Sequence, residues 1–274
     1  EIDNYGTAYG IMGNMDSEFK VVIEAHADEI SWFVNYITNE GLIYLKRNGG
    51  VDHQIAPGKR VFIHGKKGLV KAVFGWPAIH TRMGGSDRKE ASPSVENLFL
   101  DCGAKNKKEV EQLGIHIGAV ATYEEGYDEL AYDYLIGRAM DNRVGGFMIA
   151  EVARLLKEHK KKLPYGLYVV NAVQEEIGGN GAMMATHRLM PDVCACLDVT
   201  HATDTPGLDY TKFGKVTLGG GPTVSHGSAN HPKVVERLIK CADAEKIPIQ
   251  HEASSRFTGT DTDSIFITRT GVPS

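Results

Sequence analysis

The second half of the chain alternates between short apolar runs and amphipathic helical segments. Helical spacing of apolar residues occurs in three segments, at residues 141–162, 181–189 and 232–246. Strand-like runs adjoin these segments at residues 165–173, 192–200 and 247–253. Because buried strands that alternate with helices are typical of parallel sheets, this order predicts an α/β domain with a largely parallel sheet between helices.

Residues 29–125 have a different pattern, with short strands and many turns. Runs at 31–37 and 42–47 flank a Thr-Asn-Glu-Gly turn, and the run at 59–75 contains a second turn at 65–68. These are hairpin signals, and a helix is predicted only near 107–113. We therefore expect a β-rich domain at 29–125 inserted into an α/β domain formed by residues 1–28 and 126–274.

Composition places the chain among globular proteins without a nucleic-acid or membrane partner. Hydrophobic residues are 42% and charged residues 24% of the 274, and the net charge is −5. No basic stripe indicates nucleic acid binding, and no apolar run is long enough to cross a membrane. Four cysteines are too few for a disulfide scaffold, which favours a cytoplasmic location. Glu1 is not an initiator, and we expect further sequence at both ends.

Acidic and histidine residues follow the apolar runs of the α/β part. They are His26 and Asp28, Asp141 at the start of a helical segment, the adjacent pair Glu175 and Glu176, and Asp198. Ligands of open α/β sheets bind at the carboxyl ends of the strands. We therefore expect these side chains to converge on one crevice.

Imidazole and carboxylate groups together suit divalent zinc or cobalt. The spacing of His26 and Asp28 is that of a metal ligand and the acid that orients it, since side chains two apart on a strand share a face. Two metal ions would also remove the repulsion between Glu175 and Glu176. One of these acids would bind metal, and the other would accept a proton from activated water.

Each of these residues also has a simpler interpretation. His26 alone would be a hydrogen-bonded core residue, and Asp141 alone a helix N-cap. Glu175 and Glu176 alone would lie in a solvated loop, and Asp198 in a turn. The nearby C-x-C pair, Cys194 and Cys196, is a weak metal signal and is better interpreted as buried apolar side chains. Only the occurrence of all the acids at successive strand ends favours a metal site.

Five motifs in order resemble the dinuclear aminopeptidases of the tetrahedral and glutamyl aminopeptidase family. They are AHADEI, RAMDNRVGG, QEEIGGNGA, LDVTHATD and GTDTDSI. The resemblance covers nearly the whole chain. It implies an α/β peptidase domain with an inserted β-rich dimerisation domain, and homo-oligomers in which dimers assemble into a dodecamer.

The resemblance also implies roles for single residues. His26 would bind one metal ion, Asp28 would orient His26, and Asp141 would bridge two ions. Glu175 would be the general base, while Glu176 and Asp198 would each bind one ion.

Four features remain without an assigned role or depart from the family pattern. Asp261 lies in a motif of the site wall and receives no role. Ser31 and Asn180 replace a glycine and an arginine of the family pattern. The family's last histidine ligand would lie beyond Ser274.

The resulting hypothesis is hydrolysis of the N-terminal peptide bond of short peptides. Two alternatives remain open at this point. One is a glycosidase that uses Glu175 and Glu176, although adjacent positions suit that geometry poorly. The other is a non-catalytic, metal-stabilised peptide-binding or assembly protein. The sequence does not specify the preferred N-terminal residue, the native metal or the oligomer size.

Overall fold

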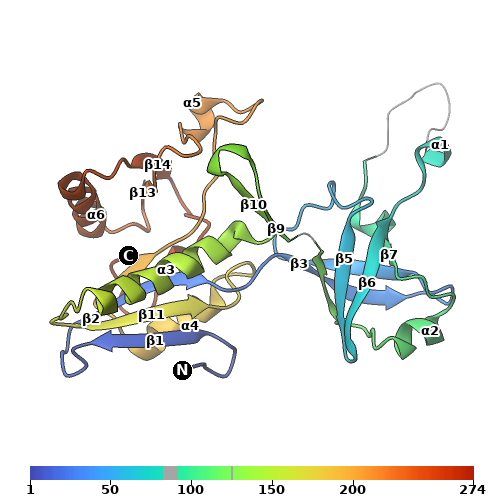
Figure 1. Ribbon diagram of the computed structural model, residues 1–274, viewed down its shortest axis with the longest axis horizontal. Coiled ribbons are helices and arrows are strands. Elements are labelled where there is room, and N and C mark those ends of the chain that lie inside the picture. The colour runs from blue at the N-terminus through green and yellow to red at the C-terminus, as the bar shows by residue number, and fades with distance from the viewer. Residues whose placement is uncertain (83–91, 125) are drawn as a thin grey trace. The chain divides into compact units, whose positions relative to one another are not determined.

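A computed structural model describes residues 1–82, 92–124 and 126–274. The chain forms two compact units. The first unit contains Glu1–Asp28 and Met140–Ser274, and the second contains Glu29–Ala139. Figure 1 shows both units coloured along the chain.

A four-stranded sheet forms the centre of the first unit. Its strands are β1 (Ala8–Gly13), β2 (Lys20–His26), β11 (Gly166–Ala172) and β12 (Val193–Cys196). Their order is β1-β11-β2-β12, and β1 is antiparallel to β11 while β11, β2 and β12 are parallel. The register pairs Ala172 with His26 and Cys196 with Glu24, so the three parallel strands end at the same edge. The predicted α/β fold is confirmed.

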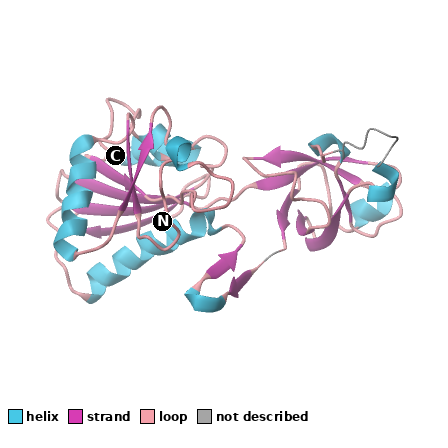
Figure 2. Ribbon diagram, turned by 90° about the horizontal axis from the view of Figure 1, so that it is seen from above, coloured by secondary structure: helices cyan, strands magenta, loops and turns pink. Residues whose placement is uncertain are grey.

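Helices cover both faces of this sheet (Figure 2). Helix α3 (Met140–Glu158) packs Ile149 against Ala25, Leu167 and Val169 on one face. On the other face, α4 (Asn180–Leu189) and α7 (Thr262–Ile265) pack against the alternate residues of β2 and β11. Successive side chains of a strand point to opposite faces of the sheet, so alternate residues of β2 and β11 contact the helices on each face.

The remaining elements of the first unit include a second, smaller sheet. Strands β13 (Thr223–Gly227) and β14 (Gln250–Ser254) pair in parallel, and α6 (Pro232–Glu245) connects them. The short helix α5 (Tyr210–Phe213) precedes β13. No helix within the described residues is both long enough and apolar enough to cross a membrane.

A closed barrel forms the core of the second unit. In barrel order the strands are β3 (Ser31–Ile37), β4 (Ile43–Asn48), β7 (Phe99–Asp101), β6 (Gly68–Gly75), β5 (Arg60–Gly65) and β8 (Val120–Tyr123). Both expected hairpins, β3–β4 and β5–β6, are present as antiparallel pairs. Trp32 and Phe74 meet edge to face inside the barrel, with ring centroids 5.2 Å apart. The predicted β-rich character is therefore confirmed.

Short helices connect the strands of this unit. They are α1 (Ile79–Arg82), η1 (Val95–Asn97) and α2 (Lys107–Gln112). Helix α2 is the one expected near residues 107–113. It begins where the Asn106 side chain accepts the backbone N–H of Glu109, which is an ordinary N-cap.

Residues 126–139 group with the barrel unit rather than with the α/β unit, where the sequence had placed them. They contain the antiparallel pair β9 (Tyr127–Glu129) and β10 (Leu135–Gly137), with η2 (Ala131–Asp133) between the two strands. Within this unit the Arg138 guanidinium donates to the carbonyl of Tyr123 and forms an ion pair with Glu29 at 2.8 Å. Sequence patterns do not reveal such a contact.

Candidate metal centre

The polar residues at the carboxyl edge of the parallel sheet lie close together. His26 is the last residue of β2, Glu175 follows the end of β11 by three positions, and Asp198 follows the end of β12 by two. Three further acids complete the group. Asp28 and Asp141 contact the His26 ring, and a ligand atom of Glu176 lies within 4.8 Å of ligand atoms of His26 and Asp141. The structure thus brings together all six residues that the sequence nominated.

His26 occupies the buried centre of the group. Its Nδ1 lies 3.1 Å from the carbonyl oxygen of Asp28 and therefore must donate a hydrogen. Its Nε2 faces carboxylates, with the Oδ1 of Asp141 at 2.8 Å, the Oδ1 of Asp198 at 3.6 Å and the Oε2 of Glu175 at 3.9 Å. Since a neutral imidazole would turn a lone pair toward these oxygens, a proton or a cation must lie at Nε2.

The pKa of His26 has the direction expected for this geometry. Burial alone would lower it, but the carboxylates of Asp141, Asp198 and Asp28 stabilise the protonated ring and raise the pKa above its ordinary value. The carboxylate oxygens that stabilise the protonated ring would also attract a divalent cation.

Asp141 is free to point into this centre because a neighbouring residue caps the helix. Asp141 and Asn142 have non-helical backbone angles at the start of α3. The Asn142 Oδ1 accepts the N–H of Gly145 at 2.9 Å, and its Nδ2 donates to the carbonyl of Leu197 at 2.7 Å. The N-cap that Asp141 could have supplied thus comes from Asn142. The second bond ties the start of α3 to the segment that carries Asp198.

The adjacent acids Glu175 and Glu176 lie on a loop that Asp28 holds in place. The carboxylate of Asp28 accepts the backbone N–H of Glu175 at 3.0 Å and that of Glu176 at 3.3 Å. Gly178 and Gly179 then turn the chain into α4 with φ of 120° and 69°, where residues with a Cβ are disfavoured. Asp28 therefore contacts the metal-ligand candidate His26 through its backbone carbonyl at 3.1 Å and through its carboxylate Oδ1 at 3.5 Å, and the same carboxylate holds the acidic loop.

Burial gives Glu175 an unusual proton affinity. Desolvation raises its pKa to about 8, His26 opposes this shift, and the nearby carboxylates of Asp261, Asp198 and Glu176 add to it. A carboxyl group whose pKa lies near neutral pH can both accept and return a proton under ordinary conditions.

The donor set fits divalent metal ions. Ligand atoms of His26, Asp141 and Glu176 all lie within 4.8 Å of one another, and the Asp198 carboxylate faces the same imidazole nitrogen. One imidazole with several carboxylates is a donor set that suits zinc, cobalt or manganese. Asp141 is the most exposed of the acids that face Nε2, so the centre remains accessible from solvent.

Sequence reasoning missed one acid near this centre and left another without a role. Glu24 on β2 and Asp261 at the start of α7 are both buried, and none of their carboxylate oxygens has a hydrogen-bond partner that satisfies ordinary geometry. Burial and the neighbouring Asp261 raise the pKa of Glu24 well above its usual range, while burial raises that of Asp261 to about 6. The signal for Glu24 was an acid within an otherwise apolar strand.

The two residues that depart from the family pattern have local partners. Ser31 is buried at the start of β3, where its hydroxyl accepts a hydrogen bond from Asn48 Nδ2 at 2.9 Å. Asn180 begins α4 and donates from its side chain to Gln174 at 3.2 Å. Both contacts are structural and do not involve the acidic centre.

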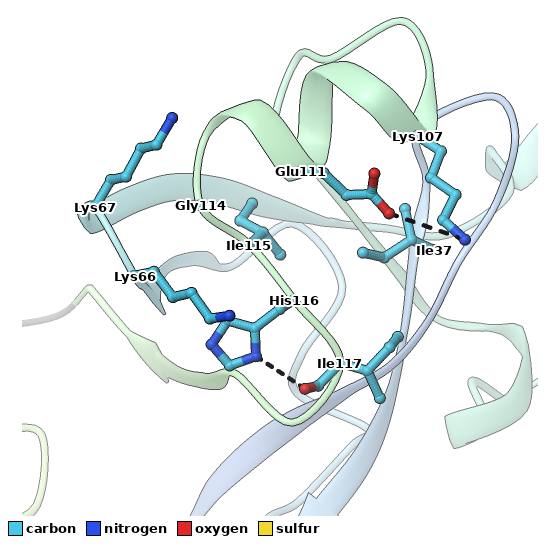
Figure 3. A pocket seen from close by; sticks show the side chains of 9 residues that line it. All are labelled: Ile37, Lys66, Lys67, Lys107, Glu111, Gly114, Ile115, His116 and Ile117. Carbon is cyan, nitrogen blue, oxygen red and sulfur yellow. Dashed lines mark hydrogen bonds and ion pairs between the residues drawn. The ribbon is translucent and has the colours of Figure 1, made fainter.

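The barrel unit contains a pocket that is separate from this group (Figure 3). Its volume is about 440 Å³. Lys107 and Glu111 of α2 form an ion pair at its rim, and His116 Nδ1 donates to the carbonyl of Ile117. The lining residues are Ile37, Lys66, Lys67, Lys107, Glu111, Gly114, Ile115, His116 and Ile117. The lining contains one acid, one histidine and no cysteine, so this pocket lacks the several carboxylates that surround His26.

Comparison with known proteins agrees with the geometry. Lysyl aminopeptidase of Pyrococcus furiosus is 30% identical over 268 residues, which are 95% of this chain and 75% of the relative. The structure of aminopeptidase APDkam598 from the archaeon Desulfurococcus kamchatkensis superposes with a TM-score of 0.88 at 31% identity, over 99% of this chain and 74% of that one.

A more distant structure shares the fold. The TET1 peptidase of Pyrococcus horikoshii, which can assemble into a tetrahedron or a large octahedral shell, superposes with a TM-score of 0.81 at 23% identity. That match covers 96% of this chain and 76% of the TET1 chain. The model of the M42 glutamyl aminopeptidases matches residues 6–274. This chain therefore belongs to the M42 glutamyl aminopeptidase family of peptidases.

Proposed function

We propose that this protein is a metal-dependent aminopeptidase that removes N-terminal residues from short peptides, with Glu175 as its general base. The observation that carries the proposal is the arrangement around His26. Its Nε2 faces the carboxylates of Asp141, Asp198 and Glu175 from within a buried position. A proton or a cation is required there, and the family is one of peptidases.

His26, Asp141, Glu176 and Asp198 would hold two divalent metal ions, with Asp141 shared between them. When bound, such ions polarise a scissile carbonyl, lower the pKa of water and can bind a free α-amine. Zinc and cobalt fit the imidazole and carboxylate donors best. The pair of ions is an inference from the donor set and the family resemblance.

Glu175 would move the proton in this reaction. Its carboxylate lies beside the proposed ligands, and its pKa of about 8 is set chiefly by burial. It would accept the proton of the attacking water and return it to the leaving amine, so that one carboxyl group serves both halves of the reaction. Bound cations would lower this pKa from its value in the metal-free protein.

Asp28 would act as a positioning residue for Glu175. It holds the backbone of Glu175 and Glu176 with its two carboxylate oxygens, and its own carbonyl fixes the orientation of the His26 ring. Burial would raise the pKa of Asp28, but the hydrogen bonds that its carboxylate accepts from the His26 ring and from the backbone N–H of Glu175 keep it below its usual value, so Asp28 remains an acceptor at neutral pH.

Assembly and location extend the proposal. We expect the barrel unit to form dimers and the dimers to form a dodecamer, by analogy with assemblies such as that of the TET1 peptidase. The cysteine content favours the cytoplasm. The glycosidase and non-catalytic alternatives receive no support from the family match.

The test compares a short peptide that has a free N-terminus with the same peptide acetylated at its N-terminus. We expect release of the first amino acid from the free peptide only, loss of this activity in EDTA and its recovery with zinc or cobalt. Equal hydrolysis of the acetylated peptide would contradict exo-cleavage. Activity that persists after complete metal removal would contradict the metal requirement, and release of sugar from a glycan in EDTA would favour the glycosidase alternative.

A further inference from the structure

Two exposed histidines on the small sheet of the first unit lie in direct contact. His226 on β13 and His251 on β14 approach with Nε2 and Nδ1 2.9 Å apart, and their ring centroids are 5.1 Å apart. The register pairs Val224 with His251 and His226 with Ala253, so the two rings are diagonal neighbours on one face of the sheet. This pair has no part in the proposed peptidase centre.

We propose that His226 and His251 form a second metal site, specific for a divalent ion of the zinc, nickel or copper type. Imidazole nitrogens are preferred ligands of these ions. Two nitrogens at about 2.0–2.1 Å from one ion would be about 2.9 Å apart at a right angle and about 3.4 Å apart in a tetrahedron. The observed separation of 2.9 Å lies at the right-angled value of nickel and copper sites, and the exposed rings would have to move apart by about 0.5 Å to reach the tetrahedral value of zinc.

The separation of 2.9 Å is also that of an ordinary hydrogen bond between the rings, which an ion would replace. Both rings are exposed, so each could bond to water instead, and exchanging water for a neighbouring ring contributes little stability. An ion would use lone pairs of both rings at once. The hydrogen now between the rings would move to the outer nitrogen of the donor ring, so that two neutral imidazoles face the ion.

The sheet beneath the rings is held rigidly, which favours a preformed site. The Gln250 side chain accepts from the N–H of Thr217 at 2.8 Å and donates to the carbonyls of Thr217 and Gly221 at 3.0 Å each. The Glu252 carboxylate accepts hydrogen bonds from Ser225 on the neighbouring strand and from Thr200. Both side chains therefore fix the strands that carry His226 and His251.

The remaining coordination positions would be filled by water. Among the described residues, only the group around His26 brings three His, Cys, Asp or Glu ligand atoms within 4.8 Å of one another. The histidine pair therefore supplies two ligands and no third. Exposure on the sheet surface gives water free access to the other positions. The site is thus of the open type, with weaker binding than the carboxylate centre.

Zinc binding measures the site directly. The full-length protein, its H226A and H251A variants and a control H187A variant are dialysed against increasing zinc concentrations, and bound zinc per chain is determined by elemental analysis. His187 is an exposed histidine in the last turn of α4 and serves as the matched control. We expect wild type and H187A to bind one more zinc ion per chain than either variant of the pair. Removing a group that hydrogen-bonds to a metal ligand costs about 10–100-fold in metal affinity, so losing a ligand itself should weaken binding of this ion at least about tenfold.

A second measurement uses the unaltered protein and so does not depend on variants that must fold. Diethyl pyrocarbonate labels exposed imidazole nitrogens, and peptide mass spectrometry locates the labels. We expect zinc to protect both His226 and His251 while His187 remains labelled. Equal zinc content in wild type, H226A and H251A, or unchanged labelling of the pair in zinc, would overturn the proposal.

Discussion

The Oδ1 of Asp28 accepts the backbone N–H of Glu175 at 3.0 Å, although the two residues are 147 positions apart in the chain. The other carboxylate oxygen, Oδ2, accepts the N–H of Glu176 at 3.3 Å. This double contact joins the end of β2 to the loop after β11. It sets where the two acids stand relative to His26.

The substitution Asp28→Asn tests this contact. The amide offers one acceptor oxygen for two backbone donors, and loss of a hydrogen bond to a charged group is worth about 1.5–3 kcal/mol. We expect kcat/KM on a free peptide to fall at least about tenfold, with the metal content unchanged. The control is Asp192→Asn, because Asp192 accepts the N–H of Lys20 at 2.7 Å, at the opposite end of β2. An equal loss of activity in both variants would indicate a general effect on the sheet.

Asn142 gives a prediction for stability. Replacement by alanine removes the cap on Gly145 and leaves the carbonyl of Leu197 without its side-chain donor. Loss of a cap costs about 0.5–2 kcal/mol, and an unsatisfied carbonyl costs about 1–3 kcal/mol when fully buried and less at a part-buried site such as this one. We expect the free energy of unfolding in urea to fall by about 1–3 kcal/mol. Asn142→Ser keeps a capping oxygen without placing a charged acceptor against the Leu197 carbonyl, and it should lose less; a larger loss in that variant would contradict this explanation.

Glu24 gives a prediction with a definite pH dependence. Burial raises its pKa far above 4.5 in the folded protein, so the folded state binds a proton that the unfolded state releases. Stability is then lost as pH rises from 4.5 toward the folded pKa. We expect Glu24→Gln to raise the melting temperature relative to wild type at pH 8 but not at pH 4. Glu40→Gln, at an exposed turn, is the control and should show no such difference.

The metal-free protein should show the same sign for Glu175. Its pKa of about 8 in the folded chain lies above the ordinary value of 4.5, so stability decreases as pH rises between these values. His26, whose pKa is also raised, adds a decrease of the same sign above pH 6.5. We expect wild type to lose more free energy of unfolding between pH 5 and pH 8 than Glu175→Gln does, as measured by urea titration in EDTA. Parallel curves for the two proteins would indicate that Glu175 is not buried as described.

Much of the fold follows from periodicity in the sequence. The β3–β4 and β5–β6 hairpins could be predicted from turn residues between apolar runs, and α3 from its apolar stripe. The parallel sheet could be predicted because strands alternate with helices, and this in turn placed His26, Glu175 and Asp198 at one edge. These elements could be predicted because turns and the alternation of apolar and polar side chains are determined by residues that are close together in the chain.

Other features depend on contacts between distant residues and could not be predicted. Arg138 bonds to Tyr123 and to Glu29, which is 109 positions away in the chain. The cap at Asn142 depends on a backbone that is non-helical for two residues. The burial of Glu24 beside Asp261 depends on how α7 packs on the sheet. Each of these requires tertiary structure, which residue spacing alone does not encode.

The most direct test of the proposed mechanism compares Glu175→Gln with Glu176→Gln in metal content and in kcat. We predict that Glu175→Gln keeps the metal content of wild type while kcat falls at least about a hundredfold, the scale of losing a general base. Glu176→Gln should instead lose bound metal, because it removes a ligand. Near-normal kcat in Glu175→Gln with full metal content would contradict the assignment of Glu175 as the proton carrier.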